Sequence, residues 1–222
     1  MTEVHPPLDW PAYRSTALRA PKRPAVPLRL TSTELTGPVF GEGTVGPLDH
    51  DLIQAHGGDP LGERIVVHGT VRDGDGRAVP HTLVEVWQAN SAGRYAHDAD
   101  RHPAPLDPNF TGVGRTLTDA DGGYRFVTVK PGAYPWRNHD NAWRPAHIHF
   151  SLFGRAFVQR LVTQMYFPGD PLFDQDPIFT SIRDPIVRDR LVSRFDLSET
   201  VPEWALAYQF DIVLGTTPME DS

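Results

Sequence analysis

From Glu63 onward, hydrophobic and polar residues alternate in short runs that end at turns rich in glycine or proline. Residues 64–71 are rich in β-branched side chains and alternate in polarity, which is the period-two pattern of a half-buried strand. A tight turn is predicted at residues 73–76, whose sequence is Asp-Gly-Asp-Gly, and residues 82–88 return as a second strand. This part of the chain is therefore expected to form strands.

The same pattern of alternating residues and turns continues toward the C-terminus. It predicts further strands at residues 124–129, 147–153, 157–167 and 208–214. The second and third of these are expected to pair antiparallel, with a turn near Gly154. Only residues 185–195 predict a short amphipathic helix. Short strands separated by glycine-rich turns favour an all-β protein with the architecture of a β-sandwich.

Residues 1–60 have a different pattern, with six prolines between Pro6 and Pro27 that exclude a long helix. Because apolar residues are interleaved with them, we expect an extended arm that packs on the core or on a partner subunit. Residues 61–222 are predicted to form the β-sandwich domain, and the chain as a whole a single domain. The polar first residues lack the apolar stretch of a signal peptide, so we expect a cytoplasmic protein.

Composition narrows the possible chemistry of the 222 residues. The absence of cysteine excludes disulfide scaffolds, thiolate zinc sites, iron–sulfur clusters and cysteine nucleophiles. A formal net charge of −7 argues against nucleic acid as a partner, because phosphate binding requires a basic face. No apolar stretch reaches the roughly 20 residues that a membrane span needs. Histidine, tyrosine and carboxylate side chains remain as potential metal ligands.

The segment with the most chemical information contains His147 and His149. Residues i and i+2 of a strand share one face, so both imidazoles are expected to project together and to converge on one ion. Ile148 should point the opposite way, into the core. A pair of this kind is often incidental, so its meaning depends on the neighbouring segments.

Two polar, aromatic loops precede this strand. Tyr134 lies before Pro135, which restricts its backbone and would hold its phenol in a defined direction. Tyr95 lies in a similar loop after the strand that ends at Gln88. Taken singly, each tyrosine is typical of an amphipathic residue with a buried ring and a solvated hydroxyl. Taken with the two histidines, they complete a set of four ligands.

The type of ligand bears on the metal. A phenol has an unperturbed pKa of about 10, so only a strong Lewis acid ionises it at neutral pH. Two phenolates with two imidazoles suit Fe(III) better than Zn(II) or Fe(II). A site of two histidines and one carboxylate for Fe(II) is the competing arrangement, but the segment around His147 offers no acidic residue. Three other histidines are expected to be solvated loop residues without a ligand role: His97, His102 and His139.

Tyr95, Tyr134 and residues 144–149 together resemble the intradiol ring-cleavage dioxygenases. Within that family, the resemblance points to the iron-bearing β chains of the members that cleave protocatechuate. It covers nearly the whole chain, through residues 11–14, 62–65, 82–90, 93–95, 104–110, 131–138, 143–150 and 208–213. The family's fold, a sandwich of the transthyretin-like type with few short helices, agrees with the strand pattern.

The resemblance implies one non-haem Fe(III) per chain, bound by Tyr95, Tyr134, His147 and His149. Tyr134 resembles the axial ligand that leaves the iron when the diol binds and then accepts a proton from the substrate. No nicotinamide or flavin is implied, and residues 112–114 lack the glycine fingerprint of a dinucleotide site.

Further residues match positions around the substrate. Arg144 is expected to place its cation over the substrate ring and to stabilise negative charge. Gln164 resembles the polar residue near the positions of dioxygen and of the anhydride intermediate. Tyr13, in the arm, resembles the residue that contacts the ring carboxylate of protocatechuate. Three residues are expected to line the pocket: Trp87, Trp136 and Ile178.

The implied reaction cleaves protocatechuate (3,4-dihydroxybenzoate) with O2 between its two hydroxylated carbons, giving 3-carboxy-cis,cis-muconate in the β-ketoadipate pathway. The implied partner is a homologous α chain, which shares the pocket and joins this chain in αβ protomers of a larger oligomer. Catechol or hydroxyquinol remains an alternative substrate. A transthyretin-like binding module without iron and a zinc hydrolase built on the two histidines are the rival interpretations from other classes.

Overall fold

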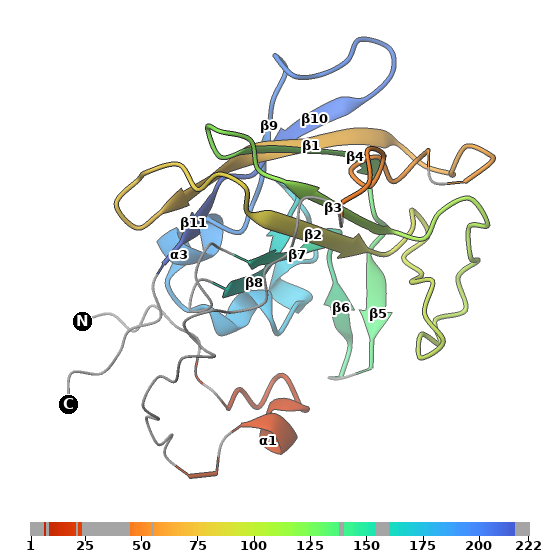
Figure 1. The fold of residues 1–222 in the computed structure, drawn as a ribbon. Helices are drawn as coiled ribbons and strands as arrows, with labels where there is room; N and C mark the ends of the chain where they lie inside the picture. The colour runs from red at the N-terminus through yellow and green to blue at the C-terminus, as the bar shows by residue number, and fades with distance from the viewer. Residues whose placement is uncertain are drawn as a thin grey trace.

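The computed structural model describes residues 7, 9–20, 22–23, 45–54, 56–137, 140–153 and 160–215. Its described residues form a β-sandwich (Figure 1). The first sheet contains β1 (Arg64–Asp73), β4 (Gly123–Val129), β9 (Arg194–Phe195), β10 (Leu206–Gln209) and β11 (Ile212–Leu214). The second sheet has the order β3 (Val113–Leu117), β2 (Leu83–Gln88), β7 (His147–Phe153) and β8 (Arg160–Tyr166). The predicted fold class is confirmed.

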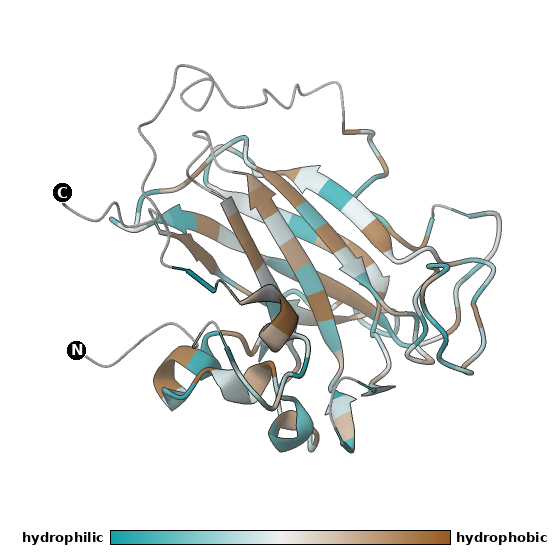
Figure 2. Ribbon diagram, turned by 90° about the horizontal axis from the view of Figure 1, so that it is seen from below, coloured by the Kyte–Doolittle hydropathy of each residue, from teal (hydrophilic) through white to brown (hydrophobic). Residues whose placement is uncertain are grey.

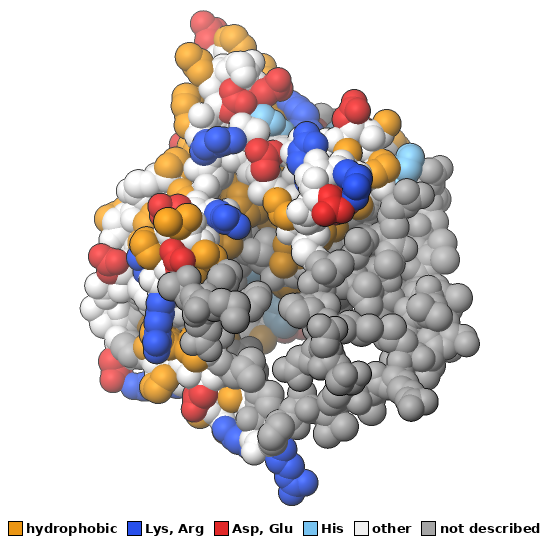
Figure 3. All heavy atoms as spheres, turned by 90° about the vertical axis from the view of Figure 1, so that its left-hand side faces the viewer, with side chains coloured by type: hydrophobic (Ala, Val, Ile, Leu, Met, Phe, Trp, Pro, Cys, Tyr) orange, Lys and Arg blue, Asp and Glu red, His pale blue; other side chains and the backbone are white. Residues whose placement is uncertain are grey.

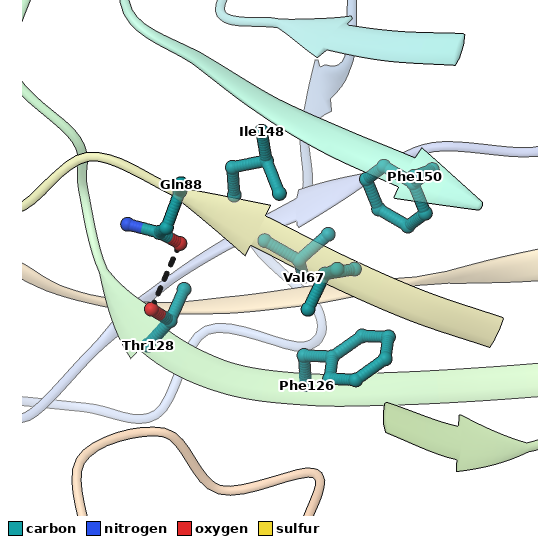
Figure 4. A pocket seen from close by; sticks show the side chains of 7 residues that line it. Val67, Gln88, Phe126, Thr128, Ile148 and Phe150 are labelled. Atoms are coloured by element: carbon teal, nitrogen blue, oxygen red, sulfur yellow. Dashed lines mark hydrogen bonds between the residues drawn. The ribbon is translucent and has the colours of Figure 1, made fainter. Parts of the chain in front are cut away.

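The core lies between the two sheets. Inward-facing residues such as Val67 and Phe126 of the first sheet pack against Val86, Ile148 and Phe150 of the second. Brown and paler residues alternate along the strands in Figure 2, as expected when one face of each strand is buried. A narrow gap in the core is lined by these five side chains and by two buried polar residues, Gln88 and Thr128, which are joined by a hydrogen bond (Figure 4).

A small hairpin stands apart from both sheets and connects the sandwich to the arm. It consists of β5 (Tyr134–Trp136) and β6 (Ala142–Arg144), which extend toward the helix α1 (Thr16–Arg19) in Figure 1. Arg14, just before α1, forms a salt bridge of 2.6 Å with Asp140, at the far end of the hairpin. The connection after β8 contains three short helices: η2 (Phe173–Gln175), η3 (Phe179–Ser181) and α3 (Pro185–Asp189).

Two predicted elements have different bounds in the structure. The helix predicted over residues 185–195 ends at Asp189, because backbone hydrogen bonds from Tyr166 to Leu191 and from Ser193 to Tyr166 draw the next residues alongside β8. The last strand, predicted as one segment over residues 208–214, is divided into β10 and β11, which pair parallel to successive parts of β1. The predicted turn at Gly154 lies outside the described residues.

The division between β10 and β11 depends on Gly69 in β1. The backbone N–H of Phe210 donates to the carbonyl of His68 at 2.8 Å, which brings the Phe210 carbonyl against Gly69. A Cβ atom at position 69 would lie 2.0 Å from that carbonyl oxygen. The close approach of the two strands therefore requires a glycine at this position.

Among the described residues, no helix is long and apolar enough to cross a membrane. On the face of the molecule shown in Figure 3, the described acidic and basic side chains are interspersed among hydrophobic ones. The described residues form no continuous basic surface on this face.

We expect Gly69→Ala to lower the free energy of unfolding by about 1–3 kcal/mol, because the added methyl group overpacks a site closed by backbone. Urea denaturation followed by circular dichroism measures the change. Gly74→Ala is the matched control, since a Cβ there meets no atom within 4 Å. Its effect should stay within about 0.5 kcal/mol. Equal destabilisation by both substitutions would contradict this account of Gly69.

Candidate active site

The two histidines of β7 project from the outer face of the second sheet, while Ile148 and Phe150 point into the core. Strand β7 lies between β2 and β8, so each histidine has neighbours in fixed register. His149 is opposite Trp87 on one side and Gln164 on the other. The Trp87 and His149 rings stack with centroids 4.7 Å apart and an angle of 3° between their planes. The predicted common face of both histidines is present in the structure.

Hydrogen bonding orients the imidazole of His147. Its Nδ1 atom lies 2.7 Å from the carbonyl oxygen of Pro145. Because a carbonyl only accepts hydrogen bonds, Nδ1 carries the proton and Nε2 of the neutral ring keeps its lone pair. The Nε2 atoms of His147 and His149 lie 3.2 Å apart, and the hydroxyl of Tyr95 lies 3.2 Å from Nε2 of His149. Three potential donor atoms thus converge on one point.

The two tyrosines reach this point from separate segments. Tyr134 begins β5 and pairs with Arg144 of β6, so it lies in a strand and not in the loop that its sequence predicted. Tyr95 lies in the loop after β2, and its ring meets that of Tyr134 edge to face at 5.6 Å. Gly93 permits this contact, because a Cβ atom at its positive φ of 78° would lie 2.4 Å from the carbonyl oxygen of Ala133.

Two polar side chains, Asn90 and Asp100, hold the loop that carries Tyr95. The amide oxygen of Asn90 accepts hydrogen bonds from the backbone of Ala92 and Arg94, and its amide nitrogen donates to Pro105 at 3.0 Å. A carboxylate oxygen of Asp100 accepts a 2.8 Å hydrogen bond from the backbone N–H of Tyr95. The loop is therefore fixed at both ends, and the Tyr95 phenol has a defined direction.

Burial keeps all four of these side chains neutral in the metal-free protein. It raises the pKa of Tyr95 above its usual value, and the neighbouring Tyr134 raises it further. Burial also raises the pKa of Tyr134, although the Arg144 cation opposes the rise. Burial lowers the pKa of His149 to about 4 and that of His147 well below its usual value, and Arg144 adds to both effects.

The arrangement fits a metal ion. Two ligand atoms that each lie about 2.1 Å from one ion are roughly 3 to 3.5 Å apart, and the observed spacings of 3.2 Å agree. In the described residues, no cluster of three or more histidine or carboxylate side chains is able to hold a metal. Asp100 and Asp176 lie close enough to raise the pKa of Tyr134, and both carboxylates already accept other hydrogen bonds. A set that includes the tyrosines is therefore favoured over two histidines and a carboxylate.

Arg144 lies beside the phenols as part of a buried network. Its Nε donates to Asp176 at 3.1 Å, and its Nη2 donates to Gln164 and, at 3.3 Å, to the hydroxyl of Tyr166. Burial alone would lower the pKa of the guanidinium, but Asp176, Tyr166 and Tyr134 together raise it more, so Arg144 stays charged. Its guanidinium carbon lies 5.3 Å from the ring centroid of Trp136, within the range of a cation–π contact.

The remaining predicted residues also lie around this point. The ring of Tyr13 packs 4.8 Å from that of Trp136, which brings the arm to the edge of the site. Ile178 is half-buried, and its backbone N–H donates to Asp176 at 2.8 Å. Of the three histidines predicted to lack a ligand role, His97 is exposed and His102 half-buried, whereas His139 lies outside the described residues.

Two residues of the site were missed by the interpretation of the sequence: Asp176 and Tyr166. Tyr166 stands two residues after Gln164 in one strand, so the alternation that paired His147 with His149 would also have paired these two. Asp176 follows a short helix in an irregular connection, where no periodicity indicates the direction of a side chain. Only the folded arrangement reveals its contact with Arg144.

Comparison with known proteins identifies the class. A family model described as "Dioxygenase" matches residues 35–216, and a model described as "Protocatechuate 3,4-dioxygenase beta subunit N terminal" matches residues 2–31. The chain belongs to the intradiol dioxygenase family and is an enzyme, so the rival interpretation as a non-catalytic binding module is wrong. Members of this family generally depend on non-haem iron.

Within the family, the chain is similar over almost its whole length to a protocatechuate 3,4-dioxygenase beta chain. That protein, from Burkholderia cepacia, is 59% identical over 221 residues, which cover 97% of this chain and 94% of the relative. A protocatechuate 3,4-dioxygenase alpha chain from Pseudomonas putida is 34% identical over 156 residues, covering 69% and 72%. The structure of 3-chlorocatechol 1,2-dioxygenase from Rhodococcus opacus matches in fold, with a TM-score of 0.61, 23% identity and coverage of 84% and 73%.

The metal-free protein should lose stability in acid because of its two buried histidines. The folded protein binds their protons only near pH 4 or below, whereas the unfolded chain binds them near 6.5. The free energy of unfolding should therefore be level above pH 6.5 and fall toward pH 4, by up to about 1.4 kcal/mol per pH unit for each histidine.

Urea denaturation in the presence of a chelator, between about pH 8 and pH 4.5, measures this slope. His149→Gln should reduce the slope, whereas His97→Gln, at an exposed position, should leave it unchanged. An equal slope in all three proteins would contradict the neutral, buried state of His149.

Proposed function

We propose that this chain binds one ferric ion through Tyr95, Tyr134, His147 and His149 and cleaves the ring of protocatechuate with O2. The observation that carries the proposal is a convergence beside the second phenol: Nε2 of His149 lies 3.2 Å from Nε2 of His147 and 3.2 Å from the hydroxyl of Tyr95. Cleavage between the two hydroxylated carbons incorporates both oxygen atoms and gives 3-carboxy-cis,cis-muconate. This step belongs to the breakdown of aromatic compounds by the β-ketoadipate pathway.

The donor set favours iron in its ferric state. Phenolates are hard, anionic oxygen ligands, and two of them stabilise a trivalent ion, a charge state that zinc does not adopt. When bound, the ion would supply Lewis acidity and a template that brings the diol and dioxygen together. Its positive charge would also ionise the two phenols whose pKa values burial raises in the metal-free protein.

The protein supplies the proton transfers and the electrostatic environment. The phenolate oxygen of Tyr134 accepts the proton of one substrate hydroxyl, so that this oxygen of the diol becomes anionic. Arg144, held charged by Asp176, stabilises the negative charge that develops as the ring opens. Trp87 and Trp136 wall the pocket and keep water from the reacting atoms, with Ile178 on the side of η3.

The arm and a partner chain would complete the pocket. We assign residues 1–60 to an arm on the single catalytic domain of residues 61–222, and we assign to Tyr13 a contact with the substrate carboxylate. The packing of the Tyr13 ring against Trp136 supports this assignment. A homologous α chain would contribute the rest of the carboxylate site in an αβ protomer, as the names of the β-chain and α-chain relatives suggest.

The purified protein should contain one iron per chain and be red from charge transfer between tyrosinate and Fe(III). His147→Ala should lose most of the iron, because a ligand anchored by the Pro145 carbonyl is removed. Tyr134→Phe should keep iron but shift the absorption band and slow the binding of substrate. Metal analysis and visible spectra before and after anaerobic addition of protocatechuate measure these effects.

The rival assignments predict different outcomes. A zinc hydrolase would be colourless and would contain zinc. A colourless preparation that stayed inactive after loading with iron, or full iron occupancy in His147→Ala, would contradict the proposed site.

Substrate choice has a separate test in the assembled enzyme. Tyr13→Phe should raise KM for protocatechuate by about tenfold, the effect of losing a hydrogen bond to a charged group, with little change for catechol. Steady-state oxygen consumption with both diols measures the ratio. A wild-type enzyme that turns over catechol or hydroxyquinol faster than protocatechuate would overturn the substrate assignment and leave the ring-cleaving chemistry intact.

A further inference from the structure

Tyr166 lies at the centre of the buried network beside the proposed iron site. It ends β8 on the face that carries Gln164, and its register partner in β7 is His147. The side chain has no exposed surface. Its ring packs edge to face against Phe173 and Phe179, at centroid distances of 6.0 Å and 5.0 Å. Packing therefore fixes the direction of the hydroxyl.

That hydroxyl contacts three polar side chains. It lies 2.8 Å from Oε1 of Gln164, 2.9 Å from Oδ2 of Asp176 and 3.3 Å from Nη2 of Arg144. The same oxygen of Asp176 accepts a hydrogen bond from Nε of Arg144, and its other oxygen accepts one from the backbone N–H of Ile178. The four side chains form a closed set in which Asp176 balances the only cation.

The network determines which end of the Gln164 amide faces it. Arginine has donors only, so the Gln164 atom that meets Arg144 must be the carbonyl oxygen. The single proton of the Tyr166 hydroxyl lies within hydrogen-bond distance of this oxygen and of Oδ2 of Asp176. In the described part of the chain, the hydrogen bonds to the Gln164 amide all end on Oε1. The two N–H groups on Nε2 are therefore directed away from Arg144 and Tyr166.

We propose that Tyr166, anchored by Asp176, is a positioning residue that holds Gln164 as a hydrogen-bond donor toward the reacting oxygen atoms. Gln164 is the register neighbour of His149, which places its amide beside the converging ligand atoms. Negative charge develops on oxygen when the ring opens, and a fixed donor in a buried site stabilises such charge without reorganisation. This inference rests on the function proposed above.

Without the Tyr166 hydroxyl, Oε1 of Gln164 keeps the donor of Arg144, and Asp176 loses one side-chain partner. The amide then samples more orientations, and the donor is displaced from the reacting atoms. Loss of an outer partner of this kind lowers activity by roughly 10- to 100-fold. We expect about a tenfold decrease in the rate of ring opening and little change in the binding of the diol.

The test compares Tyr166→Phe with a matched control, Tyr124→Phe. Tyr124 is also buried and donates its hydroxyl to a protein oxygen, the carbonyl of Phe210, but it lies in the core cluster of the sandwich. Both variants of the assembled enzyme should retain iron, the red colour and, within about twofold, the anaerobic dissociation constant for protocatechuate. In single-turnover mixing with O2, only Tyr166→Phe should open the ring about tenfold more slowly.

A double-mutant cycle with Gln164→Glu tests whether Tyr166 acts through Gln164. Glutamate keeps the contact with Arg144 but removes the N–H donor. In the Gln164→Glu background, Tyr166→Phe should slow ring opening by less than about twofold. In metal-free protein, urea denaturation should show non-additive effects for Tyr166→Phe with Gln164→Glu and additive effects for Tyr124→Phe with Gln164→Glu.

The outcomes separate this inference from the proposed function. A red, iron-loaded Tyr166→Phe enzyme with the wild-type rate would overturn only the role of Tyr166 and not the proposed function. Rate effects that multiply in the cycle would do the same. A colourless wild-type protein would overturn the iron site itself. If Tyr166→Phe does not fold, Asp176→Asn takes its place in the same cycle, and effects that multiply there would equally overturn the proposal.

Discussion

The position of the active site depends on the register of β7 between β2 and β8. Ile148 and Phe150 are held in the core, so His147 and His149 must project from the opposite face. A slip of one residue would exchange the two faces and would place imidazoles in the apolar core. Because β7 has a partner on each side, its register is specified twice. The register partners of the two histidines, Trp87 in β2 and Gln164 and Tyr166 in β8, lie at the same place. The packing of the core therefore also determines the geometry of the site.

Desolvation then sets the electrostatic character of this place. Without a metal, burial favours neutral phenols and neutral imidazoles, and Arg144 is the one cation that the described network contains. A buried guanidinium without a partner would be strongly destabilising, which explains why Asp176 is fully buried against it. The result is a site that holds lone pairs ready for a cation and a fixed positive charge ready for a substrate anion. Both features follow from burial combined with a small number of hydrogen bonds.

The amino-acid sequence predicts most strands of the sandwich, although not β3 or β9, and the shared face of His147 and His149, because these depend on local alternation. It does not predict the elements whose position depends on pairing with distant segments. Tyr134 lies in a strand because β6 pairs with β5, and the helix after Pro185 ends early because Ser193 bonds to Tyr166. The contact of Asp176 with Arg144 crosses 32 residues without any periodic signal. The resemblance to a family supplied the site residues, whereas their contacts required the fold.

The two ends of the site are held with different strength. The ligand end is fixed by buried strands and by the network of Arg144 and Asp176, whose side chains are 4% and 0% exposed. The arm is joined by the salt bridge of Arg14 and Asp140, whose side chains are 55% and 89% exposed, and such exposed pairs contribute about 0–1 kcal/mol. Apolar contacts must therefore supply most of its attachment: Leu52 and Ile53 are buried in the core cluster, and the ring of Tyr13 packs against that of Trp136. The proposed ligand atoms need constant spacing for one ion, while the surface proposed to recognise the substituent of the substrate tolerates adjustment, and the distribution of buried contacts follows that difference.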